Sequence, residues 1–181
     1  MSRSAKVAGE AVGAAMVEAF RRSGFAGATM RTLADATGLK SASLYHRFAG
    51  GKADMARAAL GHVGGGFAQM VLEPLTGADA DAALRASAAG VRRFYEHGRL
   101  ACLLAVFALS DAPDAVRADL AGVFDAWRDA LAAALARAGM ADAETAAEDR
   151  IAAVQGALVL ARATGRRDAF DRAVDAMAAR S

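Results

Sequence analysis

The sequence predicts an all-α protein of about nine helices, and three observations lead to this prediction. Alanine supplies much of a hydrophobic content of 55%, whereas aromatic residues make up only 6%. Alanine is the strongest helix former, and the β-branched and aromatic residues that favour strands are scarce. The chain has only two prolines, Pro74 and Pro113, so long stretches run without a helix breaker. With 181 residues it is long enough to bury a core.

Breaks in the helical pattern give the order of the expected elements. Apolar residues recur at helical spacing within each stretch, and Gly, Pro or an N-capping residue separates it from the next. The expected helices cover residues 2–23, 30–37, 40–48, 52–72, 78–97, 99–109, 114–138, 143–164 and 166–180. The longest apolar run, Leu100–Leu109, has half the length that a membrane span needs, so we interpret it as a buried helix and expect no membrane association.

The charge distribution separates the front of the chain from the rest. Residues 1–60 carry nine Lys/Arg and four Asp/Glu, whereas residues 61–181 carry thirteen and sixteen. A basic head on an acidic body is typical of a DNA-binding domain joined to a second domain, although a swing of this size also arises by chance. Cys102 is the only cysteine, which excludes an internal disulfide and a cysteine metal cluster. We expect a cytoplasmic protein, because the N-terminus lacks a secretory signal pattern. We also expect no metal and no cofactor.

Residues 29–52, TMRTLADATGLKSASLYHRFAGGK, have the pattern of a helix-turn-helix, a motif that places its second helix in the DNA major groove. Leu33 and Ala34 give the first helix an aliphatic and a small residue, which lets the second helix pack close. Gly38 suits a turn with positive φ. Leu44 and Phe48, four residues apart, are expected to hold the second helix on the core.

The outer residues of that second helix are small, hydroxyl-bearing, aromatic or basic, which suits contacts with phosphates and base edges. No acidic residue occurs between positions 37 and 53. Each outer residue has an alternative: Tyr45 as a half-buried core residue, His46 as a solvated one, and Arg47 as a contributor to the positive field alone. Lys52, near the start of the next helix, is a candidate phosphate clamp because helix N-termini favour anions.

Residues 16–60 resemble the N-terminal domain of the tetracycline-repressor (TetR) family. The resemblance rests on Phe20, the Gly24-Phe25 pair, Thr29, the Leu33-Ala34 pair, Gly38, the run SLYHRF from Ser43 to Phe48, and Lys52. The GGK that ends at Lys52 and the CLL of Cys102–Leu104 look most like the subgroup of drug- and flavonoid-responsive repressors. Lys40, Ser41 and Ala49 depart from the family pattern. We expect Ser41 to serve as the helix N-cap, and Lys40 to reach a phosphate, despite these departures.

The resemblance implies a helix-turn-helix DNA-binding domain over residues 1–50 and an effector-binding and dimerisation domain over residues 51–181, linked by the helix from about 52. It implies a ligand-responsive regulator, usually a repressor, that binds a near-palindromic double-stranded DNA operator as a homodimer and is released by a small, largely apolar effector. An enzyme is not expected, because the chain offers no nucleophile–base or carboxylate–His motif. The implied DNA contacts are Thr29, Lys40, Ser41, Ala42, Ser43, Tyr45, His46 and Lys52.

Aromatic and sulfur-containing residues of the body are candidates for lining the effector pocket, because such side chains form apolar, adaptable walls. The alternative for each is an ordinary place in the core. The last two helices carry small residues and apolar stripes that suit a homodimer interface, or equally burial within one chain. The pocket candidates are Phe67, Met70, Phe94, Tyr95, Cys102, Phe107, Phe124 and Trp127.

Three glycines, Gly64–Gly66, fall inside the expected linking helix, and each destabilises a helix by about 1 kcal/mol relative to alanine. One hypothesis is a hinge through which effector binding tilts the DNA-binding head, and the other is close packing against a neighbouring helix. Two further functions fit the pattern of the whole chain. One is a DNA-binding regulator controlled by a protein partner with no small-molecule ligand, and the other is an all-helical adaptor with a degenerate head.

Overall fold

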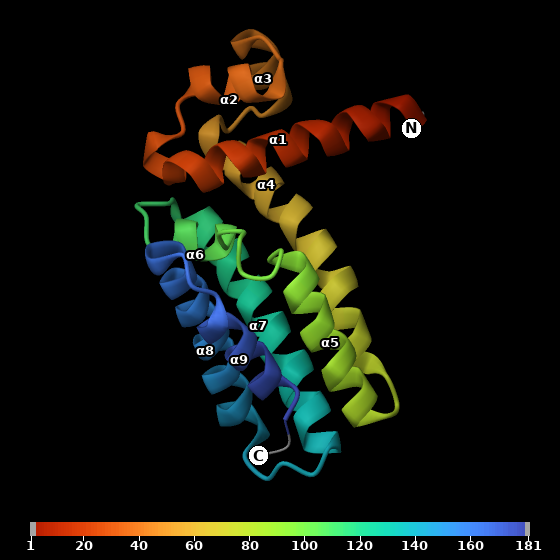
Figure 1. The fold of residues 1–181 in the computed structure, drawn as a ribbon. Coiled ribbons are helices and arrows are strands. Elements are labelled where there is room, and N and C mark those ends of the chain that lie inside the picture. The colour runs from red at the N-terminus through yellow and green to blue at the C-terminus, as the bar shows by residue number, and fades with distance from the viewer. Residues whose placement is uncertain (1–2, 180–181) are drawn as a thin grey trace. The chain divides into compact units, whose positions relative to one another are not determined.

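The computed structural model describes residues 3–179, and these residues form nine α-helices, a π-helical and a 3₁₀ segment, and no strand (Figure 1). The all-α prediction is therefore confirmed. The predicted helix ends at Ser2 and Arg180 lie outside the described residues. In chain order the elements are α1 (Arg3–Gly27), α2 (Met30–Thr37), α3 (Ser41–Arg47), α4 (Lys52–Phe67), the π-helical η1 (Ala68–Leu72), the 3₁₀ η2 (Glu73–Thr76), α5 (Ala80–Phe94), α6 (Leu103–Ala108), α7 (Asp114–Arg137), α8 (Ala143–Thr164) and α9 (Asp168–Met177).

Two helix boundaries in the middle of the chain differ from the expectation. The helix expected to reach His97 ends at Phe94, because Glu96 and His97 have φ values of 47° and 57°, in a region that ends a right-handed helix. The next helix begins at Leu103 and not at Arg99. This turn could not be predicted from the sequence, because neither Glu nor His favours positive φ as glycine does.

The chain forms two compact units. Unit 1 holds the residues up to Gly64 together with Leu103–Ala121, and unit 2 holds Gly65–Cys102 together with the residues from Gly122 onward. The boundary between the two units cuts through α4 and through α7, and in each helix it falls next to a glycine. Unit 1 therefore contains more than the first 50 residues, since α6 and the first part of α7 belong to it.

The core of unit 1 joins α1 to α6 through aromatic rings. The ring of Phe107 lies 5.1 Å from that of Phe20 and 6.1 Å from that of Phe25, edge to face in both cases. Gly24 interrupts α1 with φ 68° and ψ 178°, which turns the chain so that Phe25 reaches this core. Figure 1 shows α2 and α3 side by side next to α1, so the rings support the helix on which the helix-turn-helix rests.

Unit 2 is a bundle in which α8 and α9 run side by side and α5 packs on η1, η2 and α9 (Figure 1). Ser87 Oγ donates a hydrogen bond of 2.9 Å to the Val71 carbonyl, and a Cβ added at Gly90 would collide with the carbonyl of Met70. Arg150 of α8 donates to the carbonyls of Ala176 and Ala179 at 3.1 and 2.7 Å, which holds the end of α9. Burial lowers the pKa of this guanidinium. Within the described part of the chain, no helix is long and apolar enough to cross a membrane.

Candidate functional site

The helix-turn-helix begins with a reciprocal cap on α2. The Thr29 Oγ1 accepts a hydrogen bond of 3.1 Å from the backbone N–H of Thr32, and Thr32 Oγ1 accepts one of 2.9 Å from the N–H of Thr29. Two N–H groups that helix formation leaves unpaired are satisfied in this way. The cap fixes where α2 starts, and with it the position of the turn that follows.

The turn is as the sequence indicates, and so is one of the two expected anchors of α3, Leu44; the other, Phe48, follows the helix as its C-cap and is partly buried. Gly38 has φ 68° and ψ 12°, the left-handed conformation that glycine adopts without strain. Leu33 and Leu44 are completely buried, so α2 and α3 each fix one face on the core of unit 1. The expectation that Ser41 is the N-cap is wrong: Lys40 holds that position with extended backbone and no side-chain cap, and Ser41 is the first helical residue.

Most of the residues expected to contact DNA lie on the exposed side of this motif. Tyr45 is 53% exposed, so about half of its surface is open to a partner. None of the ion pairs between described residues involves Lys40 or Arg47, and the Arg47 guanidinium lies 5.6 Å from the ring centroid of Phe48. The exposed members of the expected set are Thr29, Lys40, Ser41, Ala42, Ser43, Tyr45 and His46.

Lys52, the first residue of α4, is placed differently from the other expected DNA contacts. It is partly buried, its Nζ donates to the Ala26 carbonyl at 3.4 Å, and it lies 4.6 Å from the ring centroid of Phe25. The carboxylate of Asp54 accepts a 2.7 Å hydrogen bond from the N–H of Gly50 beside it. The start of α4 therefore already holds one negative group, the Asp54 carboxylate. Because an ammonium has three N–H donors and the Ala26 carbonyl accepts from one of them, Lys52 keeps two for a phosphate.

Five of the eight pocket candidates lie together in unit 2: four of them form a row of rings, and Cys102 adjoins it. Phe67, Tyr95, Trp127 and Cys102 are buried, and Phe94 is partly buried. The ring centroids of Trp127 and Phe67 lie 4.9 Å apart, those of Phe67 and Phe94 5.1 Å, and those of Phe94 and Tyr95 5.0 Å. All three pairs meet edge to face, an arrangement that the ring quadrupoles favour. The Tyr95 hydroxyl lies 3.4 Å from the Cys102 sulfur. We call Trp127, Phe67, Phe94 and Tyr95 the ring row.

The other three pocket candidates lie elsewhere. Phe107 belongs to the core of unit 1, where it contacts Phe20 and Phe25. Met70 is 38% exposed on η1. Phe124 lines a groove of about 320 Å³ between α7 and α8 in unit 2. Spacing along the chain cannot separate these three from the ring row, because an apolar helical residue shows the same pattern in any core.

Sequence reasoning missed Gln155 of α8. Its side-chain Nε2 donates to the Tyr95 hydroxyl at 3.5 Å, and the residue also lines the groove that contains Phe124. Its Oε1 is buried and has no hydrogen-bond partner among residues 3–179, and the same holds for Nε1 of Trp127. The sequence does contain a signal for this residue, because Gln155 carries the single side-chain amide within the uncharged run Ile151–Leu160.

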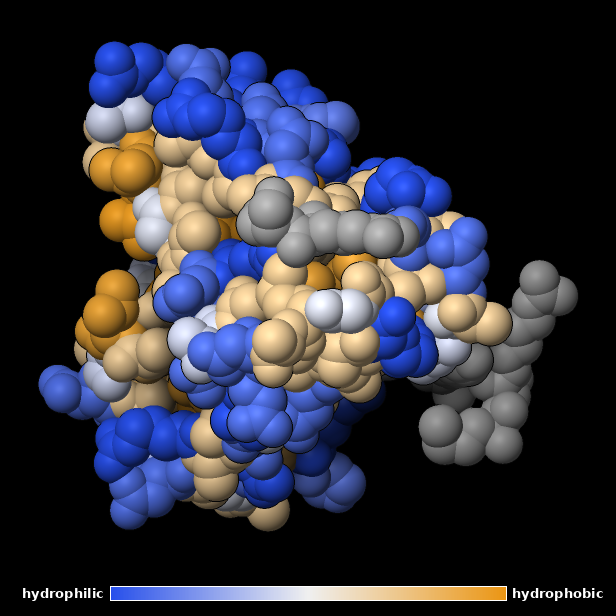
Figure 2. Space-filling view, turned by 90° about the horizontal axis from the view of Figure 1, so that it is seen from below, coloured by the Kyte–Doolittle hydropathy of each residue, from blue (hydrophilic) through white to orange (hydrophobic). Residues whose placement is uncertain are grey.

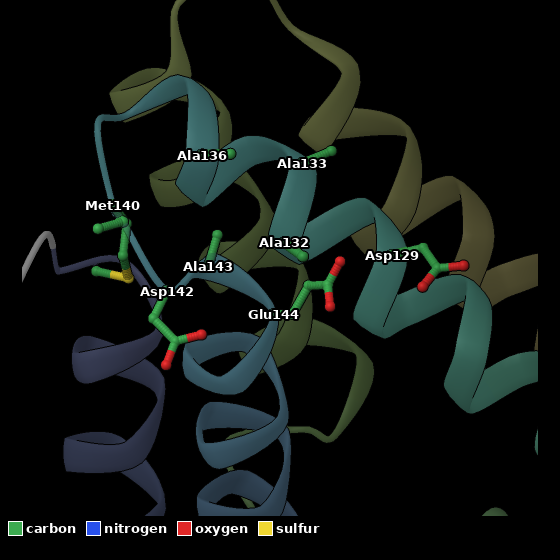
Figure 3. Close-up of a pocket in the computed structure, with 9 residues that line it drawn as sticks. Asp129, Ala132, Ala133, Ala136, Met140, Asp142, Ala143 and Glu144 are labelled. Carbon is green, nitrogen blue, oxygen red and sulfur yellow. The ribbon is translucent and has the colours of Figure 1, made fainter.

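A second hollow of unit 2, about 590 Å³, lies where α7 ends and α8 begins (Figure 3). Alanines line much of it, and Figure 3 shows Asp129 on α7 together with Asp142 and Glu144 at the start of α8. No described basic side chain lines it. The hollow therefore has the chemistry of an open acidic surface and differs from the apolar ring row.

Hydrophobic side chains also reach the surface of the molecule. Figure 2 shows them along the left side of the view, interrupted by hydrophilic residues. On α8 the large exposed ones are Val159 and Leu160, each 54% exposed, with Gly156 one turn earlier. A Cβ added at Gly156 meets no atom within 4 Å, so this part of α8 is open.

Comparison with protein families assigns both parts of the chain. Residues 14–59 match the family described as bacterial regulatory proteins, tetR family, and residues 79–176 match the C-terminal domain described as transcriptional regulator LmrA/YxaF-like. A helix-turn-helix joined to such a helical body defines a DNA-binding transcription regulator, not an enzyme. The chain belongs to the TetR family of bacterial transcriptional regulators.

Solved structures of TetR-family regulators share this fold. The regulator from Chloroflexus aurantiacus is 24% identical, with 98% of this chain and 95% of that chain covered and a TM-score of 0.82. The one from Rhodobacter sphaeroides is 21% identical, with coverage of 96% and 98% and a TM-score of 0.82. The one from Agrobacterium tumefaciens is 22% identical, with 96% of each chain covered and a TM-score of 0.79. A comparison with curated proteins gives no match.

Proposed function

We propose that this TetR-family member is a ligand-responsive repressor that binds a near-palindromic operator as a homodimer. A small, largely apolar effector releases it from the operator. It acts in the cytoplasm, where bacterial DNA is found. The expected DNA contacts and pocket residues named above are its working parts, except that Phe107 and Met70 have less to support them than the ring row.

The observation that carries the DNA-binding part is the exposed, acid-free face of α3. Leu44 fixes the inner side of this helix, so Tyr45 and His46 project outward from a rigid support. Hydroxyl, imidazole and ammonium groups on that face donate hydrogen bonds to phosphates and base edges. Lys40, the N-cap of α3, is in no ion pair with the residues that the structure describes and adds positive charge to the same face.

Two observations support the effector and the dimer. The ring row gives unit 2 a concentration of aromatic surface, and one of its polar atoms, Trp127 Nε1, has no hydrogen-bond partner among the described residues. The open strip of α8 around Gly156, Val159 and Leu160 lets another helix approach closely. A homodimer through α8 and α9 would cover it.

The first experiment is selection of bound sequences from a random DNA pool with the purified full-length protein. We expect a near-palindrome, because a dimer presents two recognition helices to adjacent half-sites of the major groove. A consensus without a repeated half-site would contradict the dimeric mode. Recovery of no consensus would contradict the regulator itself and favour the adaptor alternative.

Lys40→Gln tests the role of the α3 face. We expect weaker operator binding and a salt dependence whose log–log slope falls by about 0.9, the value for one lost phosphate contact. The matched control is Arg85→Gln, which removes one exposed positive charge from α5 in unit 2. Fluorescence anisotropy with operator DNA at several salt concentrations gives both slopes. Equal slopes for the two variants would exclude a phosphate contact at Lys40.

A further inference from the structure

We propose that α4 and α7 form a hinge of two helices, which bends at Gly64–Gly66 in α4 and at Gly122 in α7. Two contacts between long side chains, one in each unit, make the two helices bend together. The inference extends the hinge hypothesis from one helix to a pair. It goes beyond the proposed function, because neither an operator nor an effector enters the argument.

Two helices are shared by the two units. The boundary passes between Gly64 and Gly65 in α4 and between Ala121 and Gly122 in α7. The third crossing of the chain lies before Leu103, at the end of a segment that is not helical. A change in the orientation of one unit relative to the other therefore has to bend both helices, and a flexible point in α4 alone does not permit it.

The glycines at both helical crossings are open. A Cβ added at Gly65 or at Gly122 meets no atom within 4 Å, so packing does not require a glycine at either position. Glycine weakens a helix because its backbone keeps more freedom, and sharp bends occur at such positions and at π-helical turns. The π-helical η1 follows α4 directly. Each shared helix therefore has a weak point at the boundary.

In unit 1 an ion pair ties α4 to α7. Arg57 Nε donates to Asp119 Oδ2 at 2.7 Å, and Arg57 Nη2 donates to Asp119 Oδ1 at 3.5 Å. A guanidinium that meets a carboxylate at two points fixes orientation as well as distance. Arg57 precedes the glycines of α4 by about two turns, and Asp119 precedes Gly122 by about one turn. The two helices are therefore held together on this side of the boundary.

In unit 2 a ring contact ties the same two helices. The ring centroids of Phe67 and Trp127 lie 4.9 Å apart with an interplanar angle of 74°, and both side chains are buried. Phe67 directly follows Gly66, and Trp127 follows Gly122 by about one and a half turns. The two contacts enclose about 15 Å of α4 and about 12 Å of α7. Two helices that are tied on both sides of their weak points bend together, or else one of the contacts breaks.

Hydrogen–deuterium exchange of the purified full-length protein, followed by mass spectrometry, tests this hinge. A bend breaks backbone hydrogen bonds, and the freed amides exchange. Gly122→Ala should slow exchange about fivefold around position 122 of α7, and by a similar factor in residues 61–67 of α4. Replacing Gly65 and Gly66 together by alanine should have the reciprocal effect on residues 119–125. The segment in the other helix keeps its sequence in each variant, so its intrinsic exchange rate does not change.

Gly156→Ala is the matched control, because this helical glycine of α8 is also exposed and open. It should slow exchange in α8 alone. The added methyl groups at all four positions have room, so these variants should fold. Slower exchange that stays within the substituted helix would overturn the joint hinge. Slower exchange throughout the chain would also overturn it, because it would report a gain in global stability and not the loss of a local bend.

Removal of the ion pair tests how the two helices are coupled. In an Arg57→Gln background, Gly122→Ala should still slow exchange in α7 and should leave α4 unchanged. Arg85→Gln, at an exposed arginine of α5 in unit 2, is the control background and should preserve the effect on α4. An effect on α4 that persists without Arg57 would overturn the role of the ion pair, and with it the proposed coupling.

The selection of operator sequences described above tests the regulator separately. A protein that selects an operator and shows no coupled exchange contradicts the two-helix hinge alone. A protein that shows coupled exchange and selects no operator contradicts the proposed function and leaves the hinge standing.

Discussion

One residue determines the geometry of the turn between α2 and α3. Gly38 has φ 68°, and a Cβ added there would meet no atom within 4 Å. A larger side chain at this position therefore has space, and its only obstacle is the backbone conformation, which for an L-residue costs about 1–2 kcal/mol. The direction in which α3 leaves the turn, and with it the exposed face that carries Tyr45 and His46, depends on this conformation.

Gly38→Ala should accordingly lower the free energy of unfolding by about 1 kcal/mol. Gly38→Asn should lower it less, because asparagine tolerates positive φ better than alanine does. Urea denaturation followed by circular dichroism measures both. The control is Gly61→Ala in α4, at an exposed helical glycine that also has free space, where alanine should stabilise by about 0.5–1 kcal/mol. If Gly38→Ala and Gly61→Ala shifted the free energy of unfolding in the same direction, that result would contradict a backbone effect at Gly38.

At the scale of one element, α4 carries the hinge hypothesis. The division between the two units falls between Gly64 and Gly65. The alternative of close helix packing finds no support at the second and third glycines. A Cβ added at Gly65 meets no atom within 4 Å, and at Gly66 it meets only the Phe94 ring at 3.8 Å, an ordinary contact. We therefore retain the hinge as the prediction for these positions.

Replacing Gly65 and Gly66 together by alanine should leave operator affinity intact and weaken the response to ligand. Alanine stiffens the helix by about 1 kcal/mol at each position, so a motion that bends α4 becomes harder. We expect the ligand concentration that releases half of the operator to rise about fivefold, which is about 1 kcal/mol of coupling. Competition of ligand against bound DNA by fluorescence anisotropy measures it. Gly61→Ala, one turn earlier in the same helix, controls for stiffening outside the triplet, and an unchanged response in the double variant would exclude the hinge.

Local signals in the sequence were sufficient to predict the helices. Contacts between residues far apart in the chain could not be predicted from it. Gly38 and Gly165 end their helices in left-handed conformation, as glycine after a helical stretch indicates. The partners of Phe107 could not be predicted, because contacts across more than 80 residues leave no periodic trace in the chain. Gln155 escaped notice for a related reason: its importance comes from the Tyr95 hydroxyl and from an unpaired oxygen, which only the folded arrangement defines.

At the scale of the whole molecule, the proposed homodimer explains the open surface of α8. Val159 and Leu160 are each 54% exposed, although large apolar side chains favour burial, and Gly156 beside them leaves room for a second backbone. A two-fold dimer places the same strip of both copies face to face. Two recognition helices then act together on one operator, so loss of the dimer should also weaken DNA binding.

Leu160→Asp should convert the dimer to a monomer. In a symmetric interface each copy would bury an unpaired carboxylate, which costs about 3 kcal/mol or more and raises the dissociation constant by at least about a hundredfold. Sedimentation velocity over a range of concentrations measures the change, and operator affinity should fall with it. Leu109→Asp is the matched control, because Leu109 is 85% exposed and lies just after α6, away from α8 in the chain. A Leu160→Asp protein that stays dimeric while remaining folded would show that the two copies meet through another surface.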